Sequence, residues 1–295
     1  MDSDQNSEQP PARSTFVCPS CGTESVDQFC SSCGERKLGS EDRSLRHYFD
    51  VVANFLTHFD SKGYRSLWYL LTRPGFLSEE HMRGRRVRYA KPLSLFVSIN
   101  IVYYLSLSLF GANTFTTPLS VQLHMNDYYS GFASRKVESR LKTDKTSYAA
   151  FETKYDKKAG VLSKTLIFLF IPIYAILFYG LFFAHRRYFV DHAVVATHLW
   201  SFILVLLAAL VPAIAAMWMW WFKAPSIAAL LAAHDNPISV FLQVCIGVYM
   251  ALMLRRVYAA SHWYCATVAL GIAWSFFHIV WLYRFLLFVI TLRTM

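Results

Sequence analysis

Charged residues are scarce in this sequence, which excludes an ordinary soluble domain. Asp, Glu, Lys and Arg make up 16% of the 295 residues, whereas 55% are hydrophobic and 17% are aromatic. Soluble domains carry about a quarter charged residues. The mean hydropathy is positive, and several apolar runs are long enough to cross a bilayer. We therefore expect an integral membrane protein.

A secretory signal and a disulfide framework are also missing. The first 17 residues are polar and include acids, so they have neither the basic start nor the apolar core of a cleavable signal. This predicts a cytosolic amino terminus, with residues 1–15 disordered. Only Cys245 and Cys265 lie outside one short cysteine motif, and both stand in apolar segments, which is not the pattern of paired disulfides.

Several enzyme motifs are absent from the sequence. It contains no G-x-S-x-G elbow, no H-E-x-x-H helix and no phosphate-binding P-loop. The formal net charge of +10 is compatible with nucleic acid, but much of the basic charge lies beside apolar spans. Membrane topology and anionic lipid account for charge in that position. We therefore do not expect a nucleic-acid partner.

A metal motif stands near the amino end. Its four cysteines follow the spacing C-x2-C-x8-C-x2-C: Cys18, Cys21, Cys30 and Cys33. Each C-x2-C pair can close a tight turn that aims two thiolates at one ion, and Gly22 and Gly34 allow the left-handed backbone of such turns. We expect a zinc ribbon over residues 16–38, with a closed thiolate shell and therefore a structural ion. Iron is the weaker alternative, and redox-active cysteine pairs would need a thioredoxin-like pattern that the sequence lacks.

Amphipathic segments are expected over residues 44–90. An apolar stripe runs from Leu45 to Phe59, a second piece covers Tyr64 to Thr72, and a short helical turn begins at Ser78. None reaches the roughly twenty apolar residues of a membrane span. We expect them to lie on the cytoplasmic membrane face, with Trp68 at headgroup depth. A small soluble helical bundle packed on the zinc ribbon is the alternative.

A basic segment precedes the first apolar run. Its cations are Arg83, Arg85, Arg86, Arg88 and Lys91. Guanidinium groups match the geometry of phosphate, so this segment is a candidate contact for anionic lipid at headgroup height. The positive-inside rule explains the same charges without any ligand.

Residues 91–295 are expected to form an all-α transmembrane domain of about five helices. The expected spans lie near residues 93–110, 161–184, 193–222, 238–254 and 259–284. Basic residues flank them before the first span, after the second and after the fourth, which places the amino terminus in the cytoplasm and the carboxyl terminus outside. The polar stretch 113–160 then forms an external loop, although it is unusually basic for that side.

Several segments carry a family resemblance. They are CPSCG and FCSSCG in the cysteine motif, LLTRPGFLSEEHMRGRRVRYAKPLSLF, HRRYFVDHAVVATHLWSF and RRVYAASHW. With them the chain resembles an uncharacterised bacterial family of zinc-ribbon, multi-pass membrane proteins, a domain-of-unknown-function family. The resemblance implies a ribbon followed by several spans in a bacterial cytoplasmic membrane. It implies no activity and no substrate.

Ionisable residues within or beside the spans are the remaining candidates, because placing such groups in lipid costs free energy. They are Lys164, Asp191, His192, His198, His262, His278 and Arg284, with the polar residues Asn100 and Gln243. Asp191 and His198 are seven residues apart and share a helix face, whereas His262 and His278 point to nearly opposite faces. Hydrogen bonding between helices, contact with a ligand and catalysis all stay open for these residues.

Three functions are compatible with this pattern. The first is an adaptor or scaffold, whose zinc ribbon contacts a protein partner or anionic lipid on the cytoplasmic face. The second is a transporter or lipid-handling protein with a groove between spans kinked at Pro172 and Pro212. In this groove Asp191, His192 and His198 would contribute polar contacts. A membrane enzyme comes last, because no set of catalytic residues can be assembled.

Overall fold

The computed structural model describes residues 15–26, 29–35, 61–110, 115–116, 118–124, 129–185, 187–222 and 227–295. Most of the expected disordered segment 1–15 and the whole stripe from Leu45 to Phe59 lie outside the described residues. So does the end of the expected zinc ribbon, residues 36–38.

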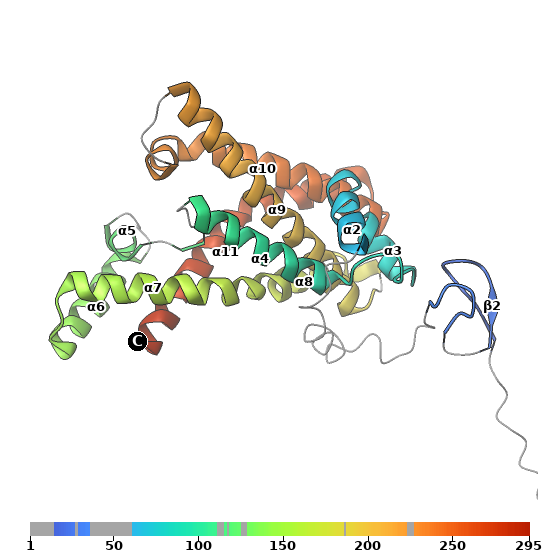
Figure 1. The fold of residues 1–295 in the computed structure, drawn as a ribbon, viewed down its shortest axis with the longest axis horizontal. Helices are drawn as coiled ribbons and strands as arrows, with labels where there is room; N and C mark the ends of the chain where they lie inside the picture. The colour runs from blue at the N-terminus through green and yellow to red at the C-terminus, as the bar shows by residue number, and fades with distance from the viewer. Residues whose placement is uncertain are drawn as a thin grey trace, which may run out of the picture.

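A two-stranded sheet opens the described chain. Strand β1 (Phe16–Val17) pairs antiparallel with β2 (Glu24–Ser25), and Phe16 lies opposite Ser25. We call residues 15–35 the knuckle. The knuckle lies at one end of the long axis of the molecule, beside α2 and α3 (Figure 1).

The rest of the described structure is helical. Its helices are α2 (Ser61–Thr72), α3 (Phe76–Met82), α4 (Pro92–Phe110), α5 (Leu119–His124), α6 (Ser130–Asp144), α7 (Tyr148–Leu166), α8 (Phe170–Leu181), α9 (Phe189–Phe222), α10 (Ile227–Tyr258) and α11 (His262–Thr294). A 3-10 turn, Ile167–Leu169, joins α7 directly to α8.

Among the described residues, four helical stretches are long and apolar enough to cross a membrane: Tyr148–Leu181, Phe189–Ala209, Val240–Tyr258 and His262–Thr294. Helix α4 lies in the place of the first expected span, and its part Pro92–Leu105 is apolar. The expected all-α membrane architecture is confirmed. The helices are longer than the expected spans, and α7 with α8 alone covers 34 residues. At 1.5 Å per residue such a helix measures about 50 Å, so it extends well beyond a hydrocarbon core of about 30 Å.

The stretch 113–160 contains regular structure instead of an open loop. Helices α5, α6 and the first half of α7 pack around the last turns of α11, in a small apolar cluster that includes Val137, Phe151, Tyr155 and Phe288. Its basic residues are therefore carried on helix surfaces at the end of the molecule opposite the knuckle, where the carboxyl terminus also lies (Figure 1).

Residues from separate basic flanks meet at the knuckle end. The Arg256 side chain pairs with Glu79 of α3 over 2.7 Å, and Arg187 donates to the carbonyl of Val257. The hydroxyl of Tyr264 donates to the carbonyl of Leu181 over 2.6 Å. The ends of α8 and α10 and the starts of α9 and α11 are thereby gathered beside α3. The membrane side on which this end lies stays a prediction.

Glycine allows α3 to approach α10 closely. Gly75, directly before α3, has φ 78°, and a Cβ built there would lie 2.9 Å from the backbone oxygen of Met253. The short helix starts at Phe76, two residues before the Ser78 start expected from the sequence. Ser78 therefore lies inside α3 and is fully buried against α9.

Candidate metal centre

Two turns of the same geometry hold the four cysteines. The backbone N–H of Gly22 donates to the carbonyl of Cys18 in the first turn, and that of Gly34 donates to Cys30 in the second, each over 2.9 Å. Gly22 and Gly34 have φ of 77° and 72°, the left-handed backbone that glycine adopts without a steric penalty. The role predicted for both glycines is confirmed.

The four sulfur atoms form one compact group. All four Sγ atoms lie within 4.8 Å of one another, and the Cys18–Cys33 and Cys21–Cys30 pairs are each 3.5 Å apart. A tetrahedral ion with metal–sulfur bonds of about 2.3 Å separates its sulfur atoms by about 3.8 Å. The arrangement therefore fits one tetrahedral metal ion, and four protein ligands fill its coordination shell.

Local hydrogen bonds favour the thiolate form that binds metals. The Thr23 hydroxyl and then the Thr23 backbone stabilise the Cys21 thiolate and lower the pKa of Cys21 to about 6. The backbone N–H of Cys33 lowers the pKa of Cys30 in the same way. Because the thiolate is the metal ligand, these two shifts favour binding at neutral pH. The pKa of Cys33 is raised to about 12, since the backbone hydrogen bond at Glu35 lowers it less than burial and the neighbouring cysteine side chains raise it.

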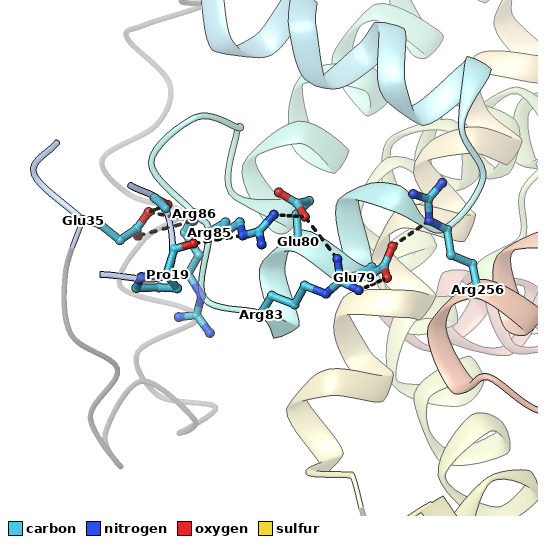
Figure 2. A network of polar contacts seen from close by, with 9 residues as sticks. Pro19, Glu35, Glu79, Glu80, Arg83, Arg85, Arg86 and Arg256 are labelled. Carbon is cyan, nitrogen blue, oxygen red and sulfur yellow. Dashed lines mark hydrogen bonds and ion pairs between the residues drawn. The ribbon is translucent and has the colours of Figure 1, made fainter. Parts of the chain in front are cut away.

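A buried carboxylate fastens the knuckle to the membrane domain. Glu35, the residue after Gly34, is 2% exposed. Its carboxylate accepts the backbone N–H group of Arg86 at 3.2 Å (Figure 2). It also accepts the backbone N–H of Val87 at 3.3 Å, and the hydroxyl of Ser20 donates to it over 2.7 Å. The second cysteine turn therefore positions the acceptor that holds the basic segment.

The first cysteine turn makes a second attachment. Nε of Arg85 donates to the carbonyl of Pro19 over 3.0 Å, and its Nη1 pairs with Glu80 over 3.2 Å (Figure 2). Pro19 directly follows Cys18, and Glu80 is buried on α3. Both metal turns thus contact residues 85–87, which we call the dock.

Ion pairs extend from the dock to α10. Arg83 pairs with Glu79 at 2.6 Å and lies 3.9 Å from Glu80, and Arg256 approaches Glu79 from α10 at 2.7 Å. The arginine side chains of these pairs are exposed, and pairs near the surface contribute about 0–1 kcal/mol each, so their main effect is to fix orientation. Carboxylates already engage the guanidinium groups of Arg83 and Arg85. Arg88 and Lys91, the last two of the predicted phosphate contacts, are both exposed.

The predicted polar residues of the spans are used in separate contacts. Nδ1 of His198 lies 2.8 Å from the Ser78 hydroxyl, and Nδ1 of His192 lies 2.7 Å from the Tyr258 hydroxyl. Asp191 accepts the backbone N–H of Tyr188 near the start of α9. Each histidine joins α9 to another helix, which is the hydrogen-bonding role left open for them.

The two histidines of α11 lie apart from this group. His262 starts α11, and His278 lies more than four turns further along. Both are exposed, and the ring of His278 lies 4.9 Å from that of Trp274. The structure does not bring them together in a shared site.

His81 is a site residue that the sequence pattern did not reveal. Burial, and then the charges of Arg86 and His198, hold the pKa of His81 well below its usual value, so the ring is neutral. Its carbonyl accepts from Nε of Arg86. The sequence did not reveal Glu35 and Glu80 as site residues either. An acid in a polar stretch gives no sign of burial until the chain has folded. The one available signal for Glu35 was its place directly after a metal turn.

Comparison with known proteins gives one partial match. A family described as a protein of unknown function (DUF3667) matches residues 60–104. This stretch covers α2, α3, the basic segment and most of α4, and it does not include the four cysteines. No curated protein and no solved structure matches the chain. The similarity therefore concerns the part of the membrane domain that holds the knuckle.

Proposed function

We propose that this protein is a membrane-embedded adaptor, whose zinc-loaded knuckle binds a protein partner at the membrane surface. The attachment of the knuckle supports the proposal most strongly. Glu35 and Pro19 belong to the two metal turns, and both are bonded to the dock. A metal ion that clamps the turns together also positions the knuckle on the membrane domain.

Zinc is the ion that suits this ligand set. Four soft thiolates in a closed shell are typical of structural zinc sites, and such a shell leaves no position for substrate or water. A module of about twenty residues cannot build a sufficient apolar core, so the ion would supply most of its folding free energy. The ion then has an architectural role and not a catalytic one.

The outer surface of the knuckle offers apolar side chains. Val17, Val26 and Phe29 are 63%, 47% and 56% exposed. Apolar groups left exposed on so small a module favour contact with a protein surface. Anionic lipid is the second expected partner at this end, and Arg88 and Lys91 are the cations placed to contact it.

Helix α2 supports a location at the membrane surface. Tyr64, Trp68 and Leu71 follow one helical stripe, and all three are exposed, whereas Ser66 and Leu70 are buried. Tyrosine and tryptophan prefer headgroup depth. The positive-inside rule then assigns this end to the cytoplasm and the carboxyl terminus to the outside.

The transporter alternative depended on Asp191, His192 and His198 as polar contacts in a groove. Hydrogen bonds to Tyr258 and Ser78 already occupy Nδ1 of the two histidines. Such bonds join helices in a membrane domain and need no transported solute. The adaptor function is therefore the better supported of the two.

Two measurements on the full-length protein test the adaptor. Elemental analysis of the purified protein should give one zinc ion per chain, with loss of the ion in Cys30→Ser. A photocrosslinker at Phe29 should capture a discrete protein partner in cells, and this capture should disappear in the Cys30→Ser background. A crosslinker at exposed Tyr64 is the control, because its position on α2 does not depend on the metal. Equal capture from Phe29 with and without Cys30 would overturn the proposal, as would a purified protein without metal.

A further inference from the structure

One face of α7 carries an uninterrupted exposed stripe. Lys154, Lys157, Val161 and Lys164 are spaced by three, four and three residues, and all four are exposed. At 3.6 residues per turn they lie within about a quarter of the helix circumference. The opposite face of the same helix is buried through Phe151, Tyr155, Ala159 and Ser163. Lys154 and Lys157 therefore point away from the protein, and Lys164 continues the same line along the helix.

This stripe lies toward one end of a candidate membrane span. Helices α7 and α8 form one continuous candidate span. After Lys164 in the sequence the exposed side chains include apolar ones, such as Ile176 and Tyr179. Val161, 62% exposed, stands between the lysines. From Lys154 to Lys164 the rise is about 15 Å, about twice the thickness of one headgroup layer. With α8 in the hydrocarbon core, the flexible lysine stems would bring the ammonium groups to the depth of the lipid phosphates.

Protein carboxylates do not neutralise these lysines in the described structure. The ion pairs recorded among the described residues all lie at the knuckle end. On α7 itself, Asp156 is turned toward α5, where it accepts the backbone N–H of Leu119 over 3.0 Å. The ammonium group of Lys164 lies 5.7 Å from the ring centre of Tyr104, which holds it beside α4 at the lipid boundary.

Two other cations at this end of the molecule, Arg140 and Lys158, bind backbone carbonyl groups. Arg140 donates to the carbonyl of Leu292, and Lys158 donates to the carbonyl of Thr294. Both satisfy carbonyl groups at the carboxyl end of α11, where cations are stabilising. The basic character of this region therefore separates into cations that cap α11 and the three lysines of the stripe.

We propose that Lys154, Lys157 and Lys164 bind the phosphate groups of anionic phospholipid at the end of the bundle opposite the knuckle. The ligand is a lipid headgroup and not a soluble anion, because the stripe continues into an apolar, exposed helix face that accommodates acyl chains. Lysine acts here as a point charge at the end of a flexible stem, which reaches a phosphate without fixed geometry. The site is separate from the basic segment at residues 83–91 and independent of the metal centre.

The test compares two variants of equal charge. Lys154, Lys157 and Lys164 are replaced together by Gln in the full-length protein, and the control replaces the exposed residues Arg135, Lys136 and Lys142 of α6 by Gln. Each protein is placed in phosphatidylcholine nanodiscs with and without phosphatidylglycerol, and the phospholipid retained after gentle release is counted by native mass spectrometry. The wild type should retain phosphatidylglycerol preferentially. The stripe variant should lose most of this selectivity, at about fivefold for each of its replaced lysines, whereas the α6 control should keep it.

Each outcome decides the proposal. Equal losses in the two variants would show diffuse attraction to the basic end and would overturn the site, as would full retention in the stripe variant. A Lys→Arg version of the stripe keeps the charge and should restore selectivity, which separates lipid binding from any loss of folding. Competition by free inorganic phosphate as effective as that by the lipid would assign the stripe to a soluble anion and would also overturn the proposal.

Discussion

The carboxylate of Glu35 accepts the backbone N–H of Arg86 over 3.2 Å and joins the metal knuckle to the loop between α3 and α4. The contact depends on both partners being in place. Glu35 is positioned by the turn that ends at Gly34, and the loop is positioned by α3, which packs against α9 and α10. The cysteine turns and the membrane domain therefore meet at Glu35, beside the second contact from Arg85 to the Pro19 carbonyl.

Replacing Glu35 by Ala should release the knuckle without unfolding the membrane domain. Hydrogen bonds to a charged group are worth about 1.5–3 kcal/mol, so the population of the undocked state should rise about 10- to 100-fold. Limited trypsin digestion, followed by mass spectrometry of the fragments, should show faster cleavage after Arg85 and Arg86. Glu24→Ala is the control, because Glu24 is exposed on the same knuckle. Equal cleavage in the two variants would show that Glu35 does not hold the knuckle.

Removal of the metal should produce the same release. A strong zinc chelator should increase trypsin cleavage after Arg85 in the wild type to the level of Glu35→Ala. It should add little in the variant, because the same contact is already lost. A wild-type protein whose cleavage does not change on chelation would show that the knuckle stays docked without its ion.

Gly75→Ala should destabilise the protein by about 1–3 kcal/mol, since the new Cβ meets the Met253 backbone at 2.9 Å and φ is 78°. Thermal unfolding in detergent should report a lower midpoint. Gly160→Ala is the matched control on α7, where a Cβ has no neighbour within 4 Å. That change should be neutral or slightly stabilising, because alanine is the better helix former. A Gly75→Ala midpoint equal to that of the control would contradict the close approach of α3 and α10.

Ser78→Ala should cost about 1–3 kcal/mol, because it leaves Nδ1 of the buried His198 ring without the hydroxyl that lies 2.8 Å away. The loss should be smaller when His198 is already replaced by Leu, so a double-mutant cycle of unfolding midpoints should show coupling. Ser139→Ala on the exposed face of α6 should have almost no effect. Purely additive losses would argue against the hydrogen bond.

Acidification should lower the stability of the folded protein through protonation of His81. Its pKa in the folded protein lies well below 6.5 because of burial and of the charges of Arg86 and His198, so the folded protein disfavours the proton that the unfolded chain accepts. Stability is therefore fully present above about pH 6.5 and falls as the pH drops below that value. The unfolding midpoint of the wild type should decrease from pH 7.5 to pH 5.5, and His81→Gln should show a smaller decrease. An identical pH dependence of the unfolding midpoint in the two proteins would contradict this prediction.

The sequence alone predicted the features that depend on local spacing or on composition. The C-x2-C turns and the positive φ at Gly22 and Gly34 depend on a few neighbouring residues. The membrane helices are recognised from their apolar runs, because a segment that lies in lipid must be apolar. Helix lengths were underestimated, because helices continue past the apolar run when protein packing at the membrane surface supports them. Helix α7 does so on the end of α11 through Phe151 and Tyr155.

Only the tertiary structure decided what the polar residues do. The sequence does not reveal whether Arg85 binds a phosphate or a carboxylate. The fold places Glu80 and the Pro19 carbonyl beside it. In the same way, His198 is paired by Ser78 from a helix far away in sequence, and Glu35 is buried only because the dock covers it. Composition determines which solvent a segment prefers, whereas the partner of a charge depends on which distant segments the packing of the helices brings within hydrogen-bond distance.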